Sequence, residues 1–92
     1  KCAVCEIDNR KLLDASHLID KSLEGTDDAR NGLVLCKNHH TALDKKLFKI
    51  DPETLELVFF GIAANDIKIT KTDITHLELK PHPIALKWKW DN

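Results

Sequence analysis

Three cysteines and one histidine form two short pairs that could chelate a single metal ion. Cys2 and Cys5 have the spacing CxxC in KCAVCE, and Cys36 and His39 have the spacing CxxH in LCKNHH. Four tetrahedral ligands of these types are typical of structural zinc, and each pair can bend around the ion as a tight turn. Because zinc contributes on the order of 10 to 16 kcal/mol in small finger peptides, we expect its removal to unfold much of the chain.

A second group of polar residues lies beside these pairs in the sequence. His40 follows His39 directly, so on a helix their two side chains would point in different directions. His40 and Asp44 are four residues apart and would share one helical face, where an imidazole and a carboxylate could hold a divalent cation. A hairpin would carry His17 and Asn31 toward the same helix. We therefore expect these polar groups to meet in one cleft.

Hydrophobic patterning places these residues on a strand, a loop, a second strand and a helix. A short apolar stretch predicts a strand over 13–18, and the aliphatic run LVLC predicts another over 33–36. Residues 20–32 are rich in Gly, Asp, Asn and Thr, which is typical of a loop. Asn38 is a favourable N-cap for a helix over 39–47.

The second half of the chain predicts further strands. Residues 47–60 alternate as a hairpin does, with turn residues at 51–54, and segments 66–70 and 76–80 suggest another strand pair. The tail allows two interpretations, because Pro83 can open a helix while four apolar residues alternate as in a strand: Ile84, Leu86, Trp88 and Trp90. The tryptophans would anchor the tail in the core with Lys87 and Lys89 outward, or would stack on a nucleic acid.

Composition sets the limits on the class of protein. The chain has 92 residues, 42% of them hydrophobic and 32% charged, which suits one small folded domain without a membrane span. The formal net charge is -1, which excludes a globally basic nucleic-acid binder, although residues 31–50 carry four lysines and one aspartate. Reduced thiols available for zinc favour the cytoplasm. The chain begins with Lys1, and we expect it to be a piece of a longer protein.

The segments ASHLI, NGLVLCKNHH and ALDKKLF together resemble the HNH endonucleases, whose three letters would be His17, Asn31 and His40. The resemblance covers residues 2–50 and is specific because the CxxC pair, a histidine, an asparagine and CxxHH occur in this order. It implies an α+β fold: a small ββα-metal domain closed by a structural zinc. Residues 1–92 would form a single HNH nuclease domain, with a core over 2–50 and a C-terminal β-rich extension over 51–92.

The resemblance also implies roles for the site residues. His17 would be the general base, and an unperturbed histidine pKa near ~6.5 suits that task at neutral pH. His40 would hold a catalytic Mg²⁺ or Mn²⁺, and Asn31 would orient the loop and the base. DNA would be cleaved to a 5′ phosphate and a 3′ hydroxyl. Because the chain lacks a broad basic surface, additional domains or a partner are expected to supply target recognition, as in a restriction or defence nuclease.

The chain departs from the family pattern at one position. Many members carry Asp or His directly before the general base as a second ligand of the catalytic metal, and this chain has Ser16. Serine is a poor ligand, so either Asp14 on the strand or Asp44 on the helix would replace it. We favour Asp44, and we expect loss of both carboxylates to abolish activity.

Two other classes of function compete with a nuclease. A non-catalytic zinc-binding scaffold or nucleic-acid-binding module would need only the four zinc ligands, and Ser16 is the best argument for it. A thiol-redox protein using Cys2 and Cys5 is a weaker alternative, because redox motifs lie at a helix start and the CxxH pair competes for the same sulfurs.

Overall fold

The computed structural model describes residues 1–19 and 29–92. Strand β1 (Leu13–His17) pairs with strand β2 (Gly32–Cys36) in an antiparallel hairpin, with Leu13 opposite Cys36 and His17 opposite Gly32. A short 3-10 turn (Arg10–Leu12) leads into β1, and another (Ala29–Asn31) leads into β2. Both strands were predicted to within a residue. Most of the loop predicted at 20–32 lies outside the described residues.

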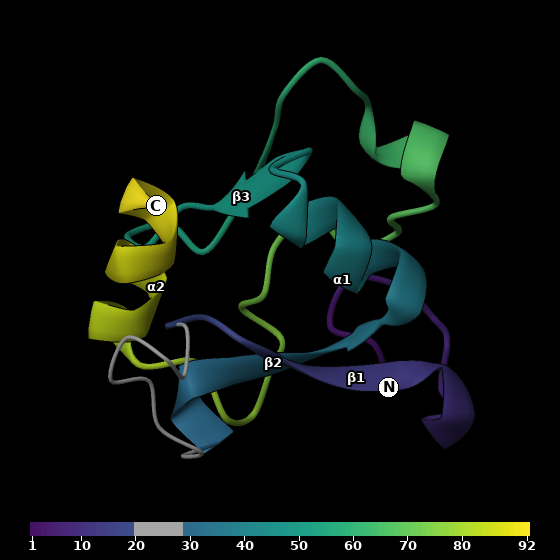
Figure 1. The fold of residues 1–92 in the computed structure, drawn as a ribbon, viewed down its shortest axis with the longest axis horizontal. Helices are drawn as coiled ribbons and strands as arrows, with labels where there is room; N and C mark the ends of the chain where they lie inside the picture. The colour runs from purple at the N-terminus through teal and green to yellow at the C-terminus, as the bar shows by residue number, and fades with distance from the viewer. Residues whose placement is uncertain (20–28) are drawn as a thin grey trace.

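Helix α1 (Lys37–Asp44) follows β2 without a linker and packs over the β1–β2 hairpin (Figure 1). Its N-cap is Cys36, not the predicted Asn38, whose side chain donates a hydrogen bond to the Ile67 carbonyl at 3.3 Å instead. The helix ends before the predicted residue 47, because Lys46 adopts a left-handed φ of 59°. The prediction of a helix here is confirmed, with both ends displaced toward the N-terminus.

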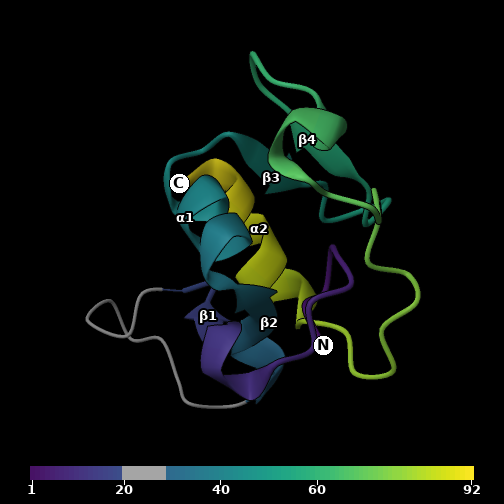
Figure 2. The ribbon, with the colours of Figure 1, turned by 90° about the vertical axis from the view of Figure 1, so that its right-hand side faces the viewer.

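The predicted hairpin at 47–60 is confirmed. Strand β3 (Phe48–Ile50) pairs antiparallel with β4 (Leu57–Phe59), so that Phe48 lies opposite Phe59. The Asp51 carboxylate forms the turn by accepting hydrogen bonds from the backbone of Glu53 at 2.8 Å and of Thr54 at 3.2 Å. Strand β3 contacts both helices, and this second hairpin lies at the opposite end of the molecule from the first (Figure 2).

The predicted second strand pair at 66–70 and 76–80 is wrong. A 3-10 turn (Ala64–Ile67) occupies the start of the first segment, and Lys68 with its φ of 61° interrupts the extended backbone. The following backbone bonds to the N-terminal segment, where the Val4 carbonyl accepts from Thr70 and Lys71 at 2.9 and 3.1 Å. The extension over 51–92 therefore contributes only β4 to the hairpin, because β3 ends at Ile50, and its expected β-rich character is limited to β4 and the bridge between Glu56 and Asp73.

The tail forms helix α2 (Pro83–Asp91) and not a strand. Pro83 occupies the first turn, and His82 caps the helix by accepting a hydrogen bond from the Ile84 amide at 3.1 Å. Ala85 and Leu86 are buried, and Lys49 of β3 donates to the Trp90 carbonyl at 2.9 Å. The helix is thus held along its length against the rest of the fold.

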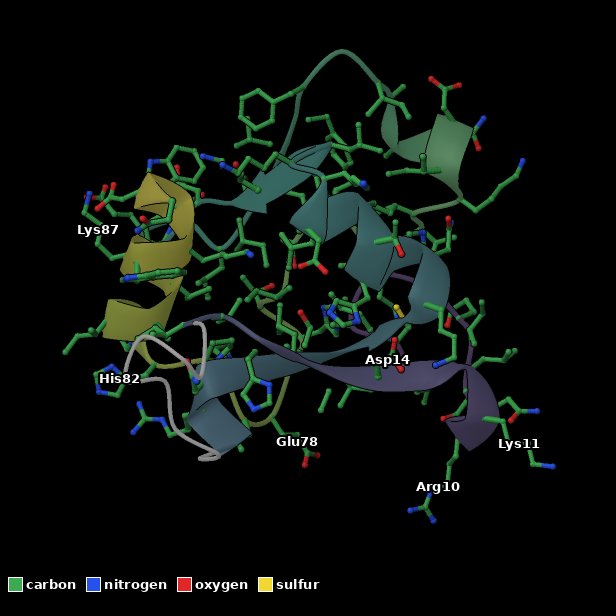
Figure 3. The ribbon with its side chains drawn as sticks, viewed as in Figure 1. Arg10, Lys11, Asp14, Glu78, His82 and Lys87 are labelled. Carbon is green, nitrogen blue, oxygen red and sulfur yellow. The ribbon has the colours of Figure 1, made fainter. Side chains whose placement is uncertain are left out.

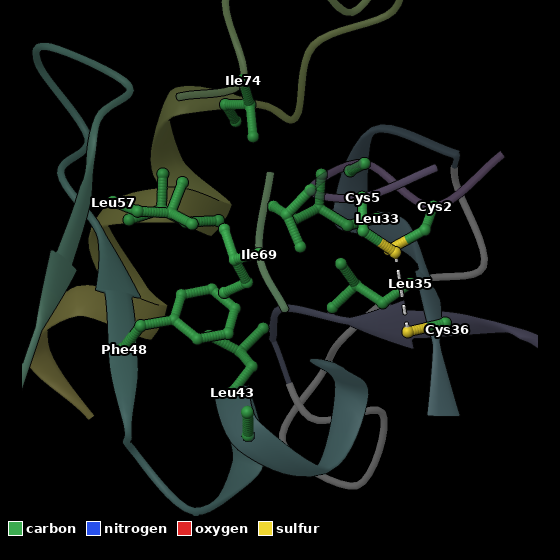
Figure 4. Close-up of a cluster of buried hydrophobic side chains, with 14 of the residues drawn as sticks. Cys2, Cys5, Leu33, Leu35, Cys36, Leu43, Phe48, Leu57, Ile69 and Ile74 are labelled. Carbon is green, nitrogen blue, oxygen red and sulfur yellow. Dashed lines mark hydrogen bonds between the residues drawn. The ribbon is translucent and has the colours of Figure 1, made fainter. Parts of the chain in front are cut away.

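One hydrophobic core joins the two hairpins and both helices. Phe48, Leu35 and Leu43 are almost completely buried at its centre (Figure 4). The three cysteines lie at one end of this core (Figure 4). The structure therefore has the small α+β architecture that the sequence predicted, with two antiparallel hairpins and two helices. Within residues 1–19 and 29–92, no helix has the length and apolar character needed to cross a membrane.

Candidate metal centre and active site

The four predicted zinc ligands meet in one buried cluster. The Cys5 and Cys36 sulfurs are 4.0 Å apart, and His39 Nδ1 lies 3.2 Å from the Cys36 sulfur and 3.7 Å from the Cys2 sulfur. All four ligand atoms lie within 4.8 Å of one another. Sulfur ligands at the usual ~2.3 Å from zinc would be about 3.8 Å apart in a tetrahedron. The donor set and spacing therefore fit a structural zinc ion.

Two segments of the chain hold this cluster from outside. His39 Nε2 lies 2.6 Å from the Ile67 carbonyl, which leaves Nδ1 as the nitrogen that faces the sulfurs. The N-terminal segment is fixed by a hydrogen bond from the Ala3 amide to the Val34 carbonyl at 2.8 Å. His76 Nε2 also contacts the Ala3 carbonyl at 3.0 Å. The extension thus orients one ligand directly and supports the CxxC segment.

The sulfurs differ in their electrostatic surroundings in the absence of metal. Burial by itself would raise the pKa of the Cys2 thiol, but hydrogen bonds from the Cys36 backbone and the His39 ring lower that pKa to about 7. Burial raises the pKa of the Cys5 thiol to about 12, and the nearby Cys2 sulfur adds to the effect. Without a cation, the cluster therefore favours a single thiolate. A bound cation would stabilise the deprotonated form of the other thiols as well.

A separate cavity of about 310 Å³ lies between β1, α1 and α2. Two of the predicted catalytic residues line it, His17 from the end of β1 and His40 from α1, and so does Asp44 of α1, the favoured second ligand of the catalytic metal. The full lining consists of Ala15, His17, Leu18, His40, Asp44, Trp88 and Lys89. The cavity is open to solvent, and its polar groups come from segments far apart in the sequence.

His40 lies between two carboxylates. Its Nδ1 is 3.0 Å from Asp14 Oδ2, and its Nε2 is 3.4 Å from Asp44 Oδ2. If Nδ1 donates to Asp14, the lone pair of Nε2 faces Asp44. Two electron-rich groups at this distance suit a shared cation between them. The side chain of His40 is 30% exposed, so an ion from solvent could reach it.

Asp14 is also bound by a lysine that the sequence did not point to. Lys37 at the start of α1 donates to Asp14 Oδ1 at 2.7 Å. The hydrogen bond from Lys37, together with that from His40, holds the pKa of Asp14 below its usual value. Asp14 therefore stays ionised, and both of its oxygens are engaged by groups on α1.

Asn31 fixes the end of the strand that carries His17. Its side-chain oxygen accepts from the Ile19 amide at 3.0 Å, and its side-chain nitrogen donates to the Ile19 carbonyl at 3.2 Å. Its own carbonyl accepts from Leu18 at 2.8 Å. Gly32 allows the strands to approach here, because a Cβ at that position would lie 2.8 Å from the Ser16 carbonyl oxygen. Asn31 does not line the cavity, so only His17, His40 and Asp44 of the polar groups expected in one cleft share it.

Ser16 points away from the cavity. Its side chain is buried, and its Oγ has no hydrogen-bond partner among the residues that the structure describes. His17, the next residue on the strand, is exposed at the cavity. This alternation follows from the two-residue period of a strand, and it leaves Ser16 unable to act as a ligand from its present position.

Sequence reasoning missed the contributions of four residues. Lys37 could have been suspected from the positive charge of the segment 31–50, and Trp88 and Lys89 were noted without a defined place. The carbonyl of Ile67 had no signal in the sequence, because any residue type can supply a backbone oxygen. Long-range packing alone brings these groups to the two sites.

Comparison with known protein families gives one match. The sequence model of the HNH endonuclease family matches residues 2–51, which include both zinc pairs and all three HNH letters. A search of curated proteins gave no match. The matched residues cover β1, β2, α1 and β3, whereas β4 and α2 lie beyond them.

Proposed function

The chain belongs to the HNH endonuclease family, and from this premise we propose that it is a metal-dependent endonuclease that hydrolyses phosphodiester bonds of DNA. The observation that carries the proposal is the shared cavity of His17, His40 and Asp44. Hydrolysis of a phosphodiester needs a base for water and positive charge near the phosphate. This cavity offers candidates for both within one solvent-accessible space.

His17 is the proposed general base. Its side chain is exposed at the cavity, where a water molecule and a phosphate can approach it. The imidazole would accept a proton from water as the water attacks phosphorus and the bond between phosphorus and the 3′ oxygen breaks. The departing 3′ oxygen would take a proton from solvent, and the imidazole would release its own proton to solvent afterwards. Asn31 supports this role by fixing the two residues that follow His17 on the chain.

His40 and Asp44 are the proposed ligands of a catalytic Mg²⁺ or Mn²⁺. Their facing atoms, 3.4 Å apart, form the edge of a binding site on the cavity wall. The ion would supply positive charge to the phosphate and to the leaving oxygen. A hard cation of this kind prefers oxygen ligands and retains several waters, so two protein ligands are compatible with its chemistry.

Asp14 is proposed to position His40 and not to bind the ion. Its contact is with Nδ1, on the side of the ring away from Asp44. A carboxylate that receives one imidazole N–H fixes the tautomer and makes the other nitrogen a better ligand. Because Lys37 occupies the remaining oxygen, Asp14 has little freedom to turn toward the cavity.

The zinc centre would shape the site without entering the chemistry. Cys36 ends β2 and caps α1, and His39 directly precedes His40. A zinc ion bound there would fix the direction in which α1 leaves the hairpin, and therefore the position of His40 relative to His17. The cytoplasm, where thiols stay reduced, would suit this centre.

The chain alone is proposed to cleave without strong sequence selectivity. Its net charge of -1 provides little general attraction to a polyanion. Additional domains or a partner would supply target recognition, as in restriction or defence nucleases, and the products would carry a 5′ phosphate and a 3′ hydroxyl. Sequence-specific binding by the isolated chain would contradict this part of the proposal.

Conversion of supercoiled plasmid to nicked or linear DNA tests the function. Zinc-loaded protein at micromolar concentration should cleave with Mg²⁺ or Mn²⁺, and His17→Ala should reduce the rate by about 10²- to 10⁴-fold. His82→Asn is a matched control, because it removes an imidazole at the far end of α2 while keeping a side chain that can cap the helix. Equal cleavage by His17→Ala and the native protein would refute the assignment of the base.

The second candidate is a zinc-binding module without catalysis, which could still bind nucleic acid. The buried Ser16 hydroxyl, which has no hydrogen-bond partner among residues 1–19 and 29–92, favours it, because many family members carry a metal ligand at the corresponding position. Zinc-loaded protein that binds DNA but leaves plasmid intact in both Mg²⁺ and Mn²⁺ would support this candidate over the nuclease.

A further inference from the structure

We propose that helix α2 completes the active site, with Lys89 binding a phosphate group of the nucleic acid and Trp88 packing against the adjoining nucleotide. The inference rests on the proposed function and extends it to residues beyond the family match, which ends at residue 51. It assigns a substrate-binding role to a helix that the family comparison does not cover.

The first observation is the composition of the cavity wall. Trp88 and Lys89 line the same cavity as His17, His40 and Asp44, so one side is supplied by the hairpin and α1 and the other by α2. A phosphodiester placed between the proposed base and the proposed cation ligands would therefore meet α2 as well. No part of the HNH motif itself lies on that side.

The second observation is the position of the Lys89 ammonium group. Its Nζ lies 3.9 Å from Asp44 Oδ1, and its side chain is only 25% exposed. A contact this long between partly exposed groups holds the lysine weakly. A phosphate oxygen offers a stronger, charge-assisted hydrogen bond at shorter distance. Lys89 can therefore turn from Asp44 to the substrate with little loss of interaction energy.

The third observation is the charge of the site. Asp14 and Asp44 place two carboxylates around His40, and Lys37 is already bound to Asp14. A phosphate that approaches Asp44 would be repelled unless positive charge stood nearby. Lys89 is the cation that shares the cavity lining with Asp44. Its charge would offset that repulsion within the cavity that His17 also lines.

Helix α2 is held firmly enough to present these side chains. The hydrogen bond from the His82 amide to the Arg30 carbonyl at 2.7 Å, the buried Ala85 and Leu86, and the bond from Lys49 to the Trp90 carbonyl fix it at both ends and in the middle. Trp88 is half-buried, so one part of the indole packs on the protein while the rest faces the cavity. An aromatic face in such a place can stack on any base.

Lys87 provides a matched control on the same helix. It bonds Asp91 at 3.0 Å, its side chain is 63% exposed, and it lies on the outer side of α2 (Figure 3). Lys87→Gln removes the same charge as Lys89→Gln without touching the cavity. A difference between the two variants therefore reports on position and not on net charge.

The experiment compares cleavage and binding in zinc-loaded native protein, Lys89→Gln, Lys89→Arg and Lys87→Gln. Lys89→Gln should lower plasmid cleavage by about 10- to 100-fold, as expected for a lost hydrogen bond to a charged group. It should also weaken binding of a short fluorescent duplex in Ca²⁺, with a salt-dependence slope smaller by about one. Lys89→Arg should keep activity within several-fold of native, and Lys87→Gln should match native protein.

Other results would overturn the inference. Equal effects of Lys89→Gln and Lys87→Gln would mean that only net charge matters. Equal losses in Lys89→Gln and Lys89→Arg, or a loss that follows a lower melting temperature, would mean that the lysine acts through packing. If native protein binds the duplex but cleaves nothing, the proposed function fails, while the binding comparison still decides the role of Lys89.

Fluorescence tests the role of Trp88 separately. Trp90→Phe leaves Trp88 as the single tryptophan, because the chain has two. Addition of the duplex in Ca²⁺ should quench its emission, and Lys89→Gln in the same background should shift the quenching to higher duplex concentration. Unchanged emission at saturating duplex would overturn the contact between Trp88 and the nucleotide.

Discussion

The zinc cluster and the cavity differ in exposure although neighbouring residues of α1 serve them. His39 in the cluster is 1% exposed, and the adjacent His40 has a side chain that is 30% exposed. The cluster offers four buried ligands, which is typical of a structural zinc site without an open position. The cavity offers two facing ligand atoms beside solvent, which is what a site that must admit a substrate requires. Adjacent residues of one helix thus face a buried candidate zinc site and an open candidate site for catalysis.

Removal of zinc should have the largest effect, and it should act on the whole fold. The binding energy of a structural zinc, on the order of 10 kcal/mol or more, exceeds what a core of this size leaves as net stability. Chelation should therefore abolish the cooperative thermal transition and much of the helical circular dichroism signal. Added Zn²⁺ should restore both, and Mg²⁺ should not. Retention of the native spectrum in protein shown to be free of zinc would contradict a structural role.

Separate substitution of the two adjacent histidines is the next test of the difference between the cluster and the cavity. His39→Ala should lose zinc and unfold, while His40→Ala should keep zinc and the fold but lower cleavage by about 10³-fold, the loss expected for several kcal/mol of charge stabilisation. Zinc content, melting temperature and plasmid cleavage would be measured for both proteins. If His40→Ala also lost zinc, the two sites would not be independent.

Substitutions of the two carboxylates around His40 should have smaller effects on cleavage, and the two effects should differ in kind. Asp44→Asn should raise the Mg²⁺ concentration needed for half-maximal cleavage, because it removes a proposed ligand. Asp14→Asn should lower activity by about 10- to 100-fold through the orientation of His40. Asp91→Asn on α2 serves as a control for loss of a surface carboxylate. Full activity in a doubly substituted Asp14→Ala, Asp44→Ala protein would exclude both roles.

The pH dependence of zinc binding should show the smallest effect. In metal-free protein the Cys5 thiol, with its pKa raised to about 12, is protonated at every pH from 5 to 8 and must release a proton on binding. Cys2, with its pKa lowered to about 7, is protonated only below that value and adds a second proton there. Apparent zinc affinity should therefore rise with pH by tenfold per unit for each proton released, more steeply below pH 7.

Competition with a chromophoric chelator between pH 5.5 and 8 would measure this dependence. A plot of the logarithm of zinc affinity against pH that keeps one slope through pH 7 would contradict the difference between Cys2 and Cys5. Mg²⁺-dependent activity of zinc-loaded protein should not follow the same curve, because the thiols do not line the cavity.

Local patterns predicted the first fifty residues well. The runs around Leu13 and Leu33 specify strands by their apolar residues, and the CxxH pair directly after the second strand requires the chain to turn into a helix. The helix ends were less predictable, because capping by Cys36 and termination at Lys46 depend on backbone geometry more than on residue type. The four zinc ligands were identifiable because their chemistry allows few other partners.

The extension shows where local patterns fail. Residues 66–70 alternate as a strand does, yet the chain turns at Lys68 and most of their amides donate to carbonyls of residues 63–65. Only the Thr70 amide of this segment donates to Val4. The alternating Trp88 and Trp90 lie on a helix, because Pro83 and the His82 cap start one and because Ala85 and Leu86 find a core to cover. In both places the available tertiary partner outweighed the local preference.

The sequence by itself determined the ββα order, the four residues of the candidate zinc cluster and the membership in the HNH family, because these depend on residue types at short and characteristic spacings. Tertiary structure decided that Asp14 faces Nδ1 of His40 while Asp44 faces Nε2. It also decided that α2 brings Lys89 to the same cavity. These contacts join residues distant along the chain, and only the packing of the whole core sets which of them can meet.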